Sequence, residues 1–222
     1  GYLHRTHGGA VPVGNHIRDI TDPVDPEYEE RSEAFRIRAN KNADAKVKMA
    51  KKALAYIEPG DVVLLDCSTS SWFLARQMPD IEITALTTSL NTIHALECKS
   101  NIRVIGLGGM YSGKYESFSG PLTERIITEF NVDKLFFSCH GISLINGIRE
   151  RDENQARLKQ AMISVSEKSI LLCDSSKIDV NSFCKVCDYD KIDILITDLL
   201  PSDEYRSEMG WNNVKVIETN RK

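Results

Sequence analysis

Short apolar runs and amphipathic helical stretches alternate along most of the chain, and polar residues or glycine follow many of the runs. Consecutive apolar residues over such short lengths are typical of strands that are buried on both faces. Alternating strands and helices predict an α/β fold, with a mostly parallel sheet and helices on both faces. The expected strands are residues 61–65, 81–86, 103–107, 134–137, 169–173, 192–197 and 214–217. The expected helices are residues 43–57, 72–78, 92–98, 121–130, 153–168 and 202–209.

The chain divides by composition into an N-terminal linker and a domain. Residues 1–42 are polar and carry Pro12, Gly14, Pro23 and Pro26, so we expect a linker there, with a solvated, charged helix near 27–38. Residues 43–222 hold the periodic pattern and are long enough to bury a sizeable core. Because the sequence starts at Gly1 rather than Met, we expect a fragment of a longer protein.

Charge and hydropathy exclude several classes of protein. The net charge of -4 gives no overall attraction to nucleic acid. No apolar run approaches the roughly 18 residues of a membrane helix, and the start shows no signal-peptide pattern. We therefore expect no membrane partner, and we expect the six cysteines to be reduced, cytoplasmic thiols.

Metal and nucleotide sites are not favoured. Cys184 and Cys187 form a single CxxC pair without the further ligands that a zinc site needs, so their role stays open. A GxGxxG pattern is absent. Gly113 and Lys114 approach a P-loop, but Tyr115 stands where a hydroxyl should bind magnesium. We expect neither a metal nor a cofactor.

The turn at residues 66–71 is the strongest candidate for a binding site. It follows a buried strand, begins with Asp66 and Cys67, and continues with four hydroxyl residues into a helix. The first amides of a helix lack intrahelical acceptors and carry partial positive charge, so a phosphate or a phosphorylated polyol would fit. The alternative is that these hydroxyls only cap the helix. Turns at 87–91, 108–109 and 174–177 are expected at the same edge of the sheet.

A succession of short motifs resembles one known family. They are residues 5–10 (RTHGGA), 65–70 (LDCSTS), 87–90 (TTSL), 108–109 (GG), Gly120, 155–162 (QARLKQAM), 174–177 (DSSK) and 196–198 (ITD). Each motif is weak alone, but their order is specific. In this order they resemble the effector-sensing domain of DeoR-family bacterial transcription regulators, over almost the whole chain.

The resemblance implies a fold, a ligand class and a set of binding residues. The sensor domain of this family is similar in fold to ribose-5-phosphate isomerase and glucosamine-6-phosphate deaminase, and it usually binds phosphorylated sugars or their derivatives. In such regulators residues equivalent to 5–10 close a winged helix-turn-helix, which this chain lacks. The implied ligand-binding residues are Asp66, Ser68, Thr69, Ser70, Thr88, Ser89, Gly108, Gly109, His140, Gly141, Gln155, Lys159 and Lys177.

Several positions depart from the family pattern. Ser68 replaces the usual glycine, which narrows the approach of a phosphate to the backbone but adds a hydroxyl donor. Thr88 replaces an asparagine, and Gln155 replaces a glutamate four residues before Lys159. Glutamine can hydrogen-bond a sugar hydroxyl, but it cannot act as a general base.

These departures favour a sensor over an enzyme. We expect Asp66 to accept hydrogen bonds from sugar hydroxyls, and Lys159, with Lys177 or Arg149, to face the phosphate. Asp174 either joins the site or caps its own turn, and His140 is either a ligand contact or a structural hydrogen-bonder. The alternative is a sugar-phosphate isomerase or deaminase of the same fold. For the sensor we expect contact with DNA only through the missing domain, and a homo-oligomer.

Overall fold

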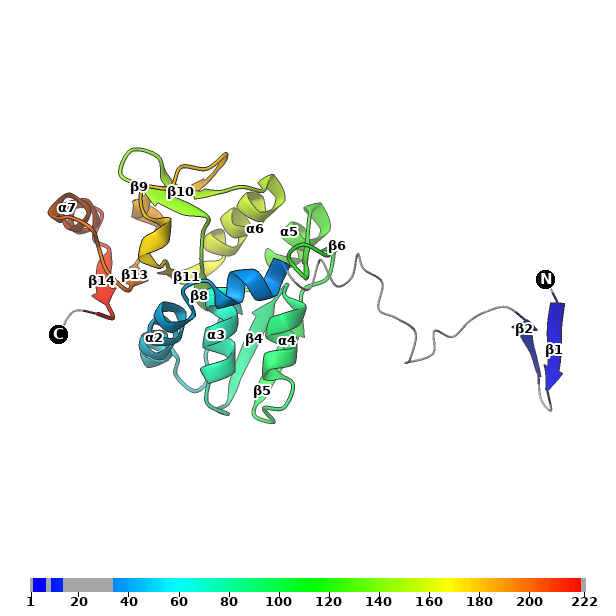
Figure 1. Cartoon of the computed structure of the whole chain (residues 1–222). Helices are drawn as coiled ribbons and strands as arrows, with labels where there is room; N and C mark the ends of the chain where they lie inside the picture. Colours follow the sequence, from blue (N-terminus) through cyan, green and yellow to red (C-terminus); the bar gives the residue numbers. More distant parts are fainter. Residues whose placement is uncertain (1, 7–8, 14–33, 221–222) are drawn as a thin grey trace.

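The computed structural model describes residues 2–6, 9–13 and 34–220 (Figure 1). Their largest element is a parallel sheet of seven strands. From one edge to the other its strands are β14 (Lys215–Glu218), β13 (Ile194–Thr197), β11 (Ser166–Leu172), β8 (Val132–Phe137), β3 (Val62–Leu65), β4 (Ile83–Thr87) and β5 (Ile102–Gly106). The expected α/β fold with a parallel sheet is confirmed.

Helices cover both faces of the sheet. One face packs against α2 (Ala43–Ala53), α3 (Thr69–Gln77) and α4 (Leu90–Leu96). The other face packs against α5 (Pro121–Ile127), α6 (Glu153–Ser164) and α7 (Asp203–Trp211). Successive residues of a strand point to opposite faces, so Val63 and Leu65 enter the first core layer and Leu64 the second, all fully buried.

The described residues form three smaller sheets besides the main one. An antiparallel sheet has the order β12 (Cys184–Cys187), β10 (Gly147–Glu150), β9 (Gly141–Ser143). Two strand pairs are formed by β6 (Met110–Ser112) with β7 (Ser117–Ser119), and by β1 (Tyr2–Thr6) with β2 (Gly9–Val13). Single turns of 3-10 helix are η1 (Leu54–Tyr56), η2 (Ser175–Lys177) and η3 (Tyr189–Lys191). No helix in the described ranges is both long and apolar enough to cross a membrane.

A turn at Asn146 and Gly147 joins β9 to β10, and the positive φ of 64° at Gly147 explains the glycine. The antiparallel sheet itself was not predicted, because its strands are only three or four residues long.

Three predicted helices needed correction. The helix expected from residue 72 begins at Thr69, because the Ser68 side chain accepts a hydrogen bond from the Ser71 amide and caps it earlier. The helix expected to reach residue 168 ends at Ser164, because Ser166 already pairs with Val132 of β8. In these two cases a cap and a strand partner decided the boundary.

The third correction concerns α2, whose buried face is rotated from the predicted one. The spacing of Val47, Ala50, Leu54 and Ile57 predicts a core face with the lysines opposite, but Val47 is 41% exposed and Lys46 is 4% exposed. Lys46 shares a helix face with the buried Met49 and Ala50, three and four residues later. This rotation carries its ammonium group inward.

Part of residues 1–42 is structured, which differs from the expected linker. Residues 34–40 form a helix, and Phe35 and Ala39 on it are buried, so this end of the expected solvated helix packs against the domain. The remainder of that expected helix, residues 27–33, lies outside the described residues. Strands β1 and β2 were also unpredicted, and they pair from Tyr2 with Val13 to Thr6 with Gly9.

Candidate functional site

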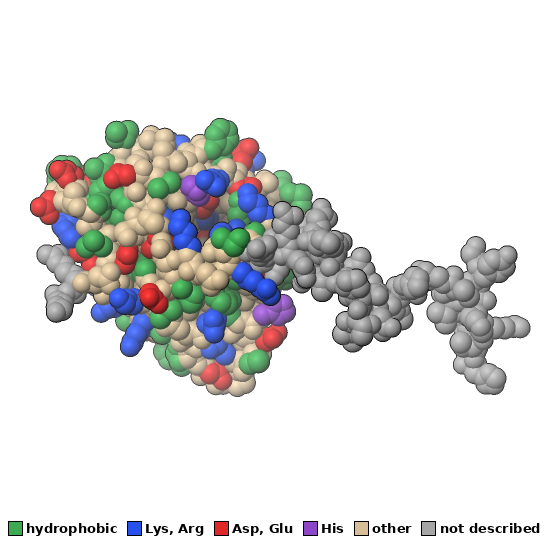
Figure 2. All heavy atoms as spheres, viewed as in Figure 1, with side chains coloured by type: hydrophobic (Ala, Val, Ile, Leu, Met, Phe, Trp, Pro, Cys, Tyr) green, Lys and Arg blue, Asp and Glu red, His purple; other side chains and the backbone are tan. Residues whose placement is uncertain are grey.

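A cavity of about 470 Å³ opens over the carboxyl ends of β3, β8 and β11, within the size range of small-molecule sites. The chain runs from β3 to β4 and β5 on one side, whereas β8 and β11 lie on the other, so the cavity sits where the strand order reverses. Figure 2 shows Lys and Arg side chains gathered around a hollow with a histidine nearby. The lining residues are Arg38, Lys41, Asn42, Lys46, Cys67, Ser68, Thr69, Lys114, Tyr115, Ser138, Cys139, His140, Glu150, Arg151, Gln155, Lys159, Asp174, Ser176, Lys177 and Val180.

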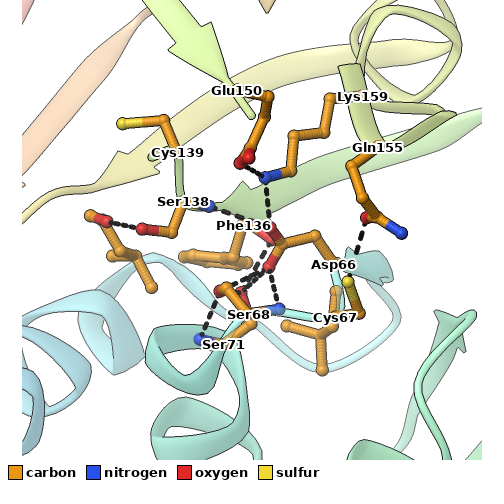
Figure 3. A network of polar contacts seen from close by, with 12 residues as sticks. Asp66, Cys67, Ser68, Ser71, Phe136, Ser138, Cys139, Glu150, Gln155 and Lys159 are labelled. Atoms are coloured by element: carbon orange, nitrogen blue, oxygen red, sulfur yellow. Dashed lines mark hydrogen bonds and ion pairs between the residues drawn. The ribbon is translucent and has the colours of Figure 1, made fainter. Parts of the chain in front are cut away.

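Asp66 organises the loop beneath this cavity (Figure 3). One of its oxygens accepts from the backbone and hydroxyl groups of Ser68 and from the Ser71 hydroxyl, at 2.6 to 3.1 Å. Its other oxygen accepts from the Ser138 amide at 3.0 Å. The side chain is buried and does not line the cavity, which differs from the expected contact with sugar hydroxyls. The geometry makes Asp66 a positioning residue.

Lys159 lies between two carboxylates. Its ammonium is 3.4 Å from an Asp66 oxygen and contacts Glu150 directly, and all three side chains are nearly fully buried. Burial opposes the charge on Lys159, but Glu150 and Asp66 outweigh burial and raise its pKa. Lys159 is therefore a permanent cation, and its charge is largely balanced by Asp66 and Glu150. The contact with Lys159 holds Glu150 at the cavity wall.

Lys46 is a buried cation with a different environment. Its ammonium donates to the carbonyl oxygens of Arg38 and, at 2.6 Å, Lys41. Burial, followed by the positive charge of Lys177, lowers the pKa of Lys46 to about 8. A bound anion would compensate both effects.

The turn after β11 forms the next wall. Asp174 accepts from the Asn42 amide at 2.7 Å and the Ser176 hydroxyl at 2.6 Å. Burial opposes its charge, but Lys177 and these hydrogen bonds outweigh burial and lower its pKa. Lys177 donates to the Ser138 hydroxyl at 2.6 Å. Both alternatives left open for Asp174 therefore apply, since it caps its turn and lines the cavity.

Several buried polar atoms of the site have no partner among the described residues. They include the Gln155 amide nitrogen, His140 Nδ1 and one Arg38 guanidinium nitrogen, all from cavity-lining residues. Gln155 is only 2% exposed, and its carbonyl oxygen accepts from the Cys67 thiol at 3.0 Å. Burial, then the charge of Arg151, lowers the pKa of His140 and favours a neutral ring. Buried groups of this kind normally find a partner, so they point to a polar ligand.

Six of the expected binding residues line the cavity, namely Ser68, Thr69, His140, Gln155, Lys159 and Lys177. Ser70 and Gly141 do not line it but flank residues that do. A side chain at Gly141 would approach the Val180 carbonyl oxygen to 2.0 Å, so this glycine allows β9 to pass close to the backbone at Val180.

The turns after β4 and β5 lie away from the cavity, because these strands occupy one edge of the sheet. Ser89 caps α4, and Thr88 is fully buried. Gly108 accepts from the Thr123 hydroxyl, and Gly109 has a φ of 154° and no room for a side chain beside Thr123. Arg149 donates to the carbonyl oxygens of Asn146, Ser182 and Phe183 instead of lining the cavity. None of these five residues lines the cavity.

Sequence reasoning missed the contribution of residues 38–46. Arg38, Lys41, Asn42 and Lys46 all line the cavity, although they precede the first strand of the sheet. One signal was available, because Lys46 shares a helix face with Met49 and Ala50. Glu150 was also missed, since it belongs to the unpredicted antiparallel sheet.

Comparison with known proteins agrees with this architecture. Residues 41–199 match the model of the DeoR C terminal sensor domain. The chain is 40% identical to the L-fucose operon activator of Haemophilus influenzae, over 98% of this chain and 82% of that protein. It is 32% identical to the putative aga operon transcriptional repressor of Escherichia coli O157:H7, over 91% of this chain and 72% of that protein.

Among solved structures, ribose 5-phosphate isomerase A from Methanocaldococcus jannaschii is similar, with a TM-score of 0.45 and 16% identity, over 62% of this chain and 55% of that one. The family is established by the sensor-domain match, which spans most of the described domain, together with the identity to known regulators. The chain therefore belongs to the DeoR family of transcription regulators and carries their C-terminal, effector-binding sensor domain.

Proposed function

We propose that the cavity binds a phosphorylated sugar, or a phosphorylated sugar derivative, as the effector of the regulator. The observation that carries this proposal is the charge of the cavity wall. In the described part of the chain, seven Lys and Arg side chains line the cavity against two carboxylates, Glu150 and Asp174, although the whole protein has a net charge of -4. Such a concentration of positive charge favours an anionic ligand.

The phosphate group has a natural place between Lys46, Lys177 and the start of α3. Among the described residues Lys46 forms no direct ion pair, although the charge of Asp174 acts on it, and Lys177 is held by a neutral hydroxyl. The amides of the first turn of α3, at Thr69 and Ser70, have no acceptor within their own helix. An ammonium–phosphate contact at this place is charge-assisted and correspondingly strong.

The sugar would extend toward Gln155 and Glu150. The free amide nitrogen of Gln155 donates to a sugar oxygen, and Glu150, which lines the cavity, accepts from a sugar hydroxyl. This division gives the cavity one end for the charge and one end for the polyol. It also explains why the Gln155 amide nitrogen is buried without a partner among the described residues.

We further propose binding without turnover. An isomerase needs a base near the acidic carbon of its substrate. Position 155 holds an amide, and the carboxylates of Asp66 and Glu150 are tied to Lys159. The relatives named above are an L-fucose operon activator and a putative aga operon transcriptional repressor, which favours a regulatory outcome of binding. In this proposal the effector changes how a winged helix preceding this domain holds DNA, in a cytoplasmic homo-oligomer.

The proposal is tested by calorimetric titration with matched phosphorylated and unphosphorylated sugars, with each sample followed by NMR for product. We expect binding that depends on the phosphate and leaves the ligand unchanged. Lys46→Met should weaken that binding by about 10- to 100-fold, the equivalent of one charged hydrogen bond.

Lys51→Met is the matched control, because Lys51 is exposed on the same helix. Equal affinity for phosphorylated and unphosphorylated sugars would refute the ligand class. Product formation would instead establish the isomerase or deaminase alternative.

A further inference from the structure

The segment at residues 34–42, here called the strap, forms one wall of the cavity before the sheet begins. It consists of the helix at 34–40 and the turn into α2, where Asn42 has a left-handed φ of 54°. Arg38, Lys41 and Asn42 of the strap all line the cavity. We propose that the strap is itself part of the effector site, and that an anion bound in the cavity fixes it against the domain. This inference rests on the proposed anionic effector.

Polar contacts within the cavity attach the strap to the domain. Lys46 donates to the carbonyl oxygens of Arg38 and Lys41, near the end of the strap helix. The Asn42 amide donates to Asp174 at 2.7 Å and to the Ser176 hydroxyl at 2.8 Å. A ligand that contacts these groups therefore alters the hydrogen bonds that attach the strap to the domain.

An apolar contact lies outside the cavity. The ring of Phe35, which is 6% exposed, packs edge-on against Trp72 of α3 with centroids 5.4 Å apart. Phe35 does not line the cavity. This separation matters, because it allows docking of the strap to be weakened without removing a side chain that lines the cavity, although the Arg38 guanidinium lies 5.9 Å from the centre of the Phe35 ring.

The charges of the cavity explain why an anion should tighten the strap. The docked strap brings the positive charges of Arg38 and Lys41 toward Lys46 and Lys177. Asp174 is the carboxylate whose negative charge partly offsets these cations at Lys46. Like charges in a partly buried space repel one another, which weakens docking while the cavity is empty. A phosphate dianion removes this repulsion.

Lys46 links the ligand to the strap helix. Its ammonium has three N–H donors, and two of them point to strap carbonyls, which leaves the third for an anion. A cation beside the last carbonyls of a helix also interacts favourably with the helix dipole. The bound anion keeps Lys46 charged and so strengthens its hold on the strap.

The consequence is a thermodynamic coupling. A ligand that contacts strap residues binds the docked state more tightly than the undocked state, and it therefore shifts the population toward docking. By reciprocity, any change that favours the undocked strap lowers the binding affinity of the ligand to the same degree. The strap is joined at residue 34 to the N-terminal part of the chain. Ligand binding in the cavity therefore changes how firmly that part is attached to the domain.

The test uses inorganic phosphate as the probe and the full chain as the protein. Hydrogen exchange at the amides of 34–42 is measured during a phosphate titration, and phosphate affinity is measured by calorimetry for Phe35→Ala. We expect exchange of the strap to slow as phosphate binds, and affinity to fall about tenfold in Phe35→Ala, because the binding-competent population is smaller.

Two further variants separate coupling from general damage. Ile37→Ala alters a side chain that is 61% exposed on the same helix, and it should leave phosphate affinity unchanged. Phe35→Leu retains an apolar side chain and should recover part of the affinity that Phe35→Ala loses.

Unchanged affinity in Phe35→Ala, or unchanged strap exchange at saturating phosphate, would overturn the coupling alone. Absence of phosphate binding in the unmodified chain would overturn the anion site and the coupling together.

Discussion

The lowered pKa of Lys46 leads to a quantitative prediction about effector binding. Burial and the charge of Lys177 bring this pKa to about 8, so the group titrates within an accessible range of pH. Asp174 counteracts the shift, and Lys41 and Arg38 add to it. If a phosphorylated sugar binds the charged form of Lys46, its affinity must fall as pH rises through about 8.

The size of the effect follows from the fraction of Lys46 that is charged. That fraction is about 0.9 at pH 7 and about 0.1 at pH 9, so affinity should fall by about tenfold between these values. The ligand does not contribute, because the second pKa of a phosphate monoester is about 6. Burial raises the pKa of Cys67 to about 11 and that of Tyr115 to about 12, so neither titrates in this window.

The assay is calorimetry with one phosphorylated sugar at half-unit steps from pH 7 to pH 9, for the unmodified chain and for Lys46→Met. The unmodified chain should show a falling affinity, and Lys46→Met should show a weaker and nearly constant one. A flat profile in the unmodified chain, or the same slope in both proteins, would refute the assignment of Lys46 to the phosphate.

Three further predictions concern stability and specificity. Lys159→Met leaves two buried carboxylates without their cation, so we expect a loss of about 3–5 kcal/mol in unfolding free energy, partly restored by adding Glu150→Gln. Denaturant titration measures the unfolding free energy of the single and the double variant, and equal values for the two would contradict the reasoning. Gly141→Ala should cost about 1–3 kcal/mol, since its methyl group would meet the Val180 carbonyl oxygen, and an unchanged melting temperature would argue against that close approach. Gln155→Met removes the free amide donor without adding a charge, so affinity for a phosphorylated sugar should fall about 2- to 10-fold by calorimetry; unchanged affinity would exclude Gln155 from the sugar end.

The sequence predicted those parts of the fold that depend on local periodicity. The main parallel sheet and the helices on both faces followed from alternating apolar runs, because a strand buried on both faces needs an apolar residue at each position. The small antiparallel sheet was missed, since strands of three or four residues leave too short a pattern. Helix ends were misplaced where the Ser68 cap or the pairing of Ser166 with Val132 decided the boundary.

The candidate site was predicted in part for a similar reason. The turns holding Ser68 and Lys177 meet at the cavity because β3, β8 and β11 are neighbours in the sheet. The turns holding Thr88 and Gly108 follow β4 and β5, and strand order, which decides their distance, is a tertiary property. Lys46 was missed because a lysine on an amphipathic helix is normally solvated, and its burial depends on the strap.

The most direct test of the central claim is the structure of this chain with a sugar phosphate bound. We predict that the phosphate lies within hydrogen-bond distance of the Lys46 and Lys177 ammonium groups and of an amide in the first turn of α3, with the sugar directed toward Gln155. A phosphate at the Glu150 end of the cavity, or a ligand bound elsewhere on the molecule, would contradict the account.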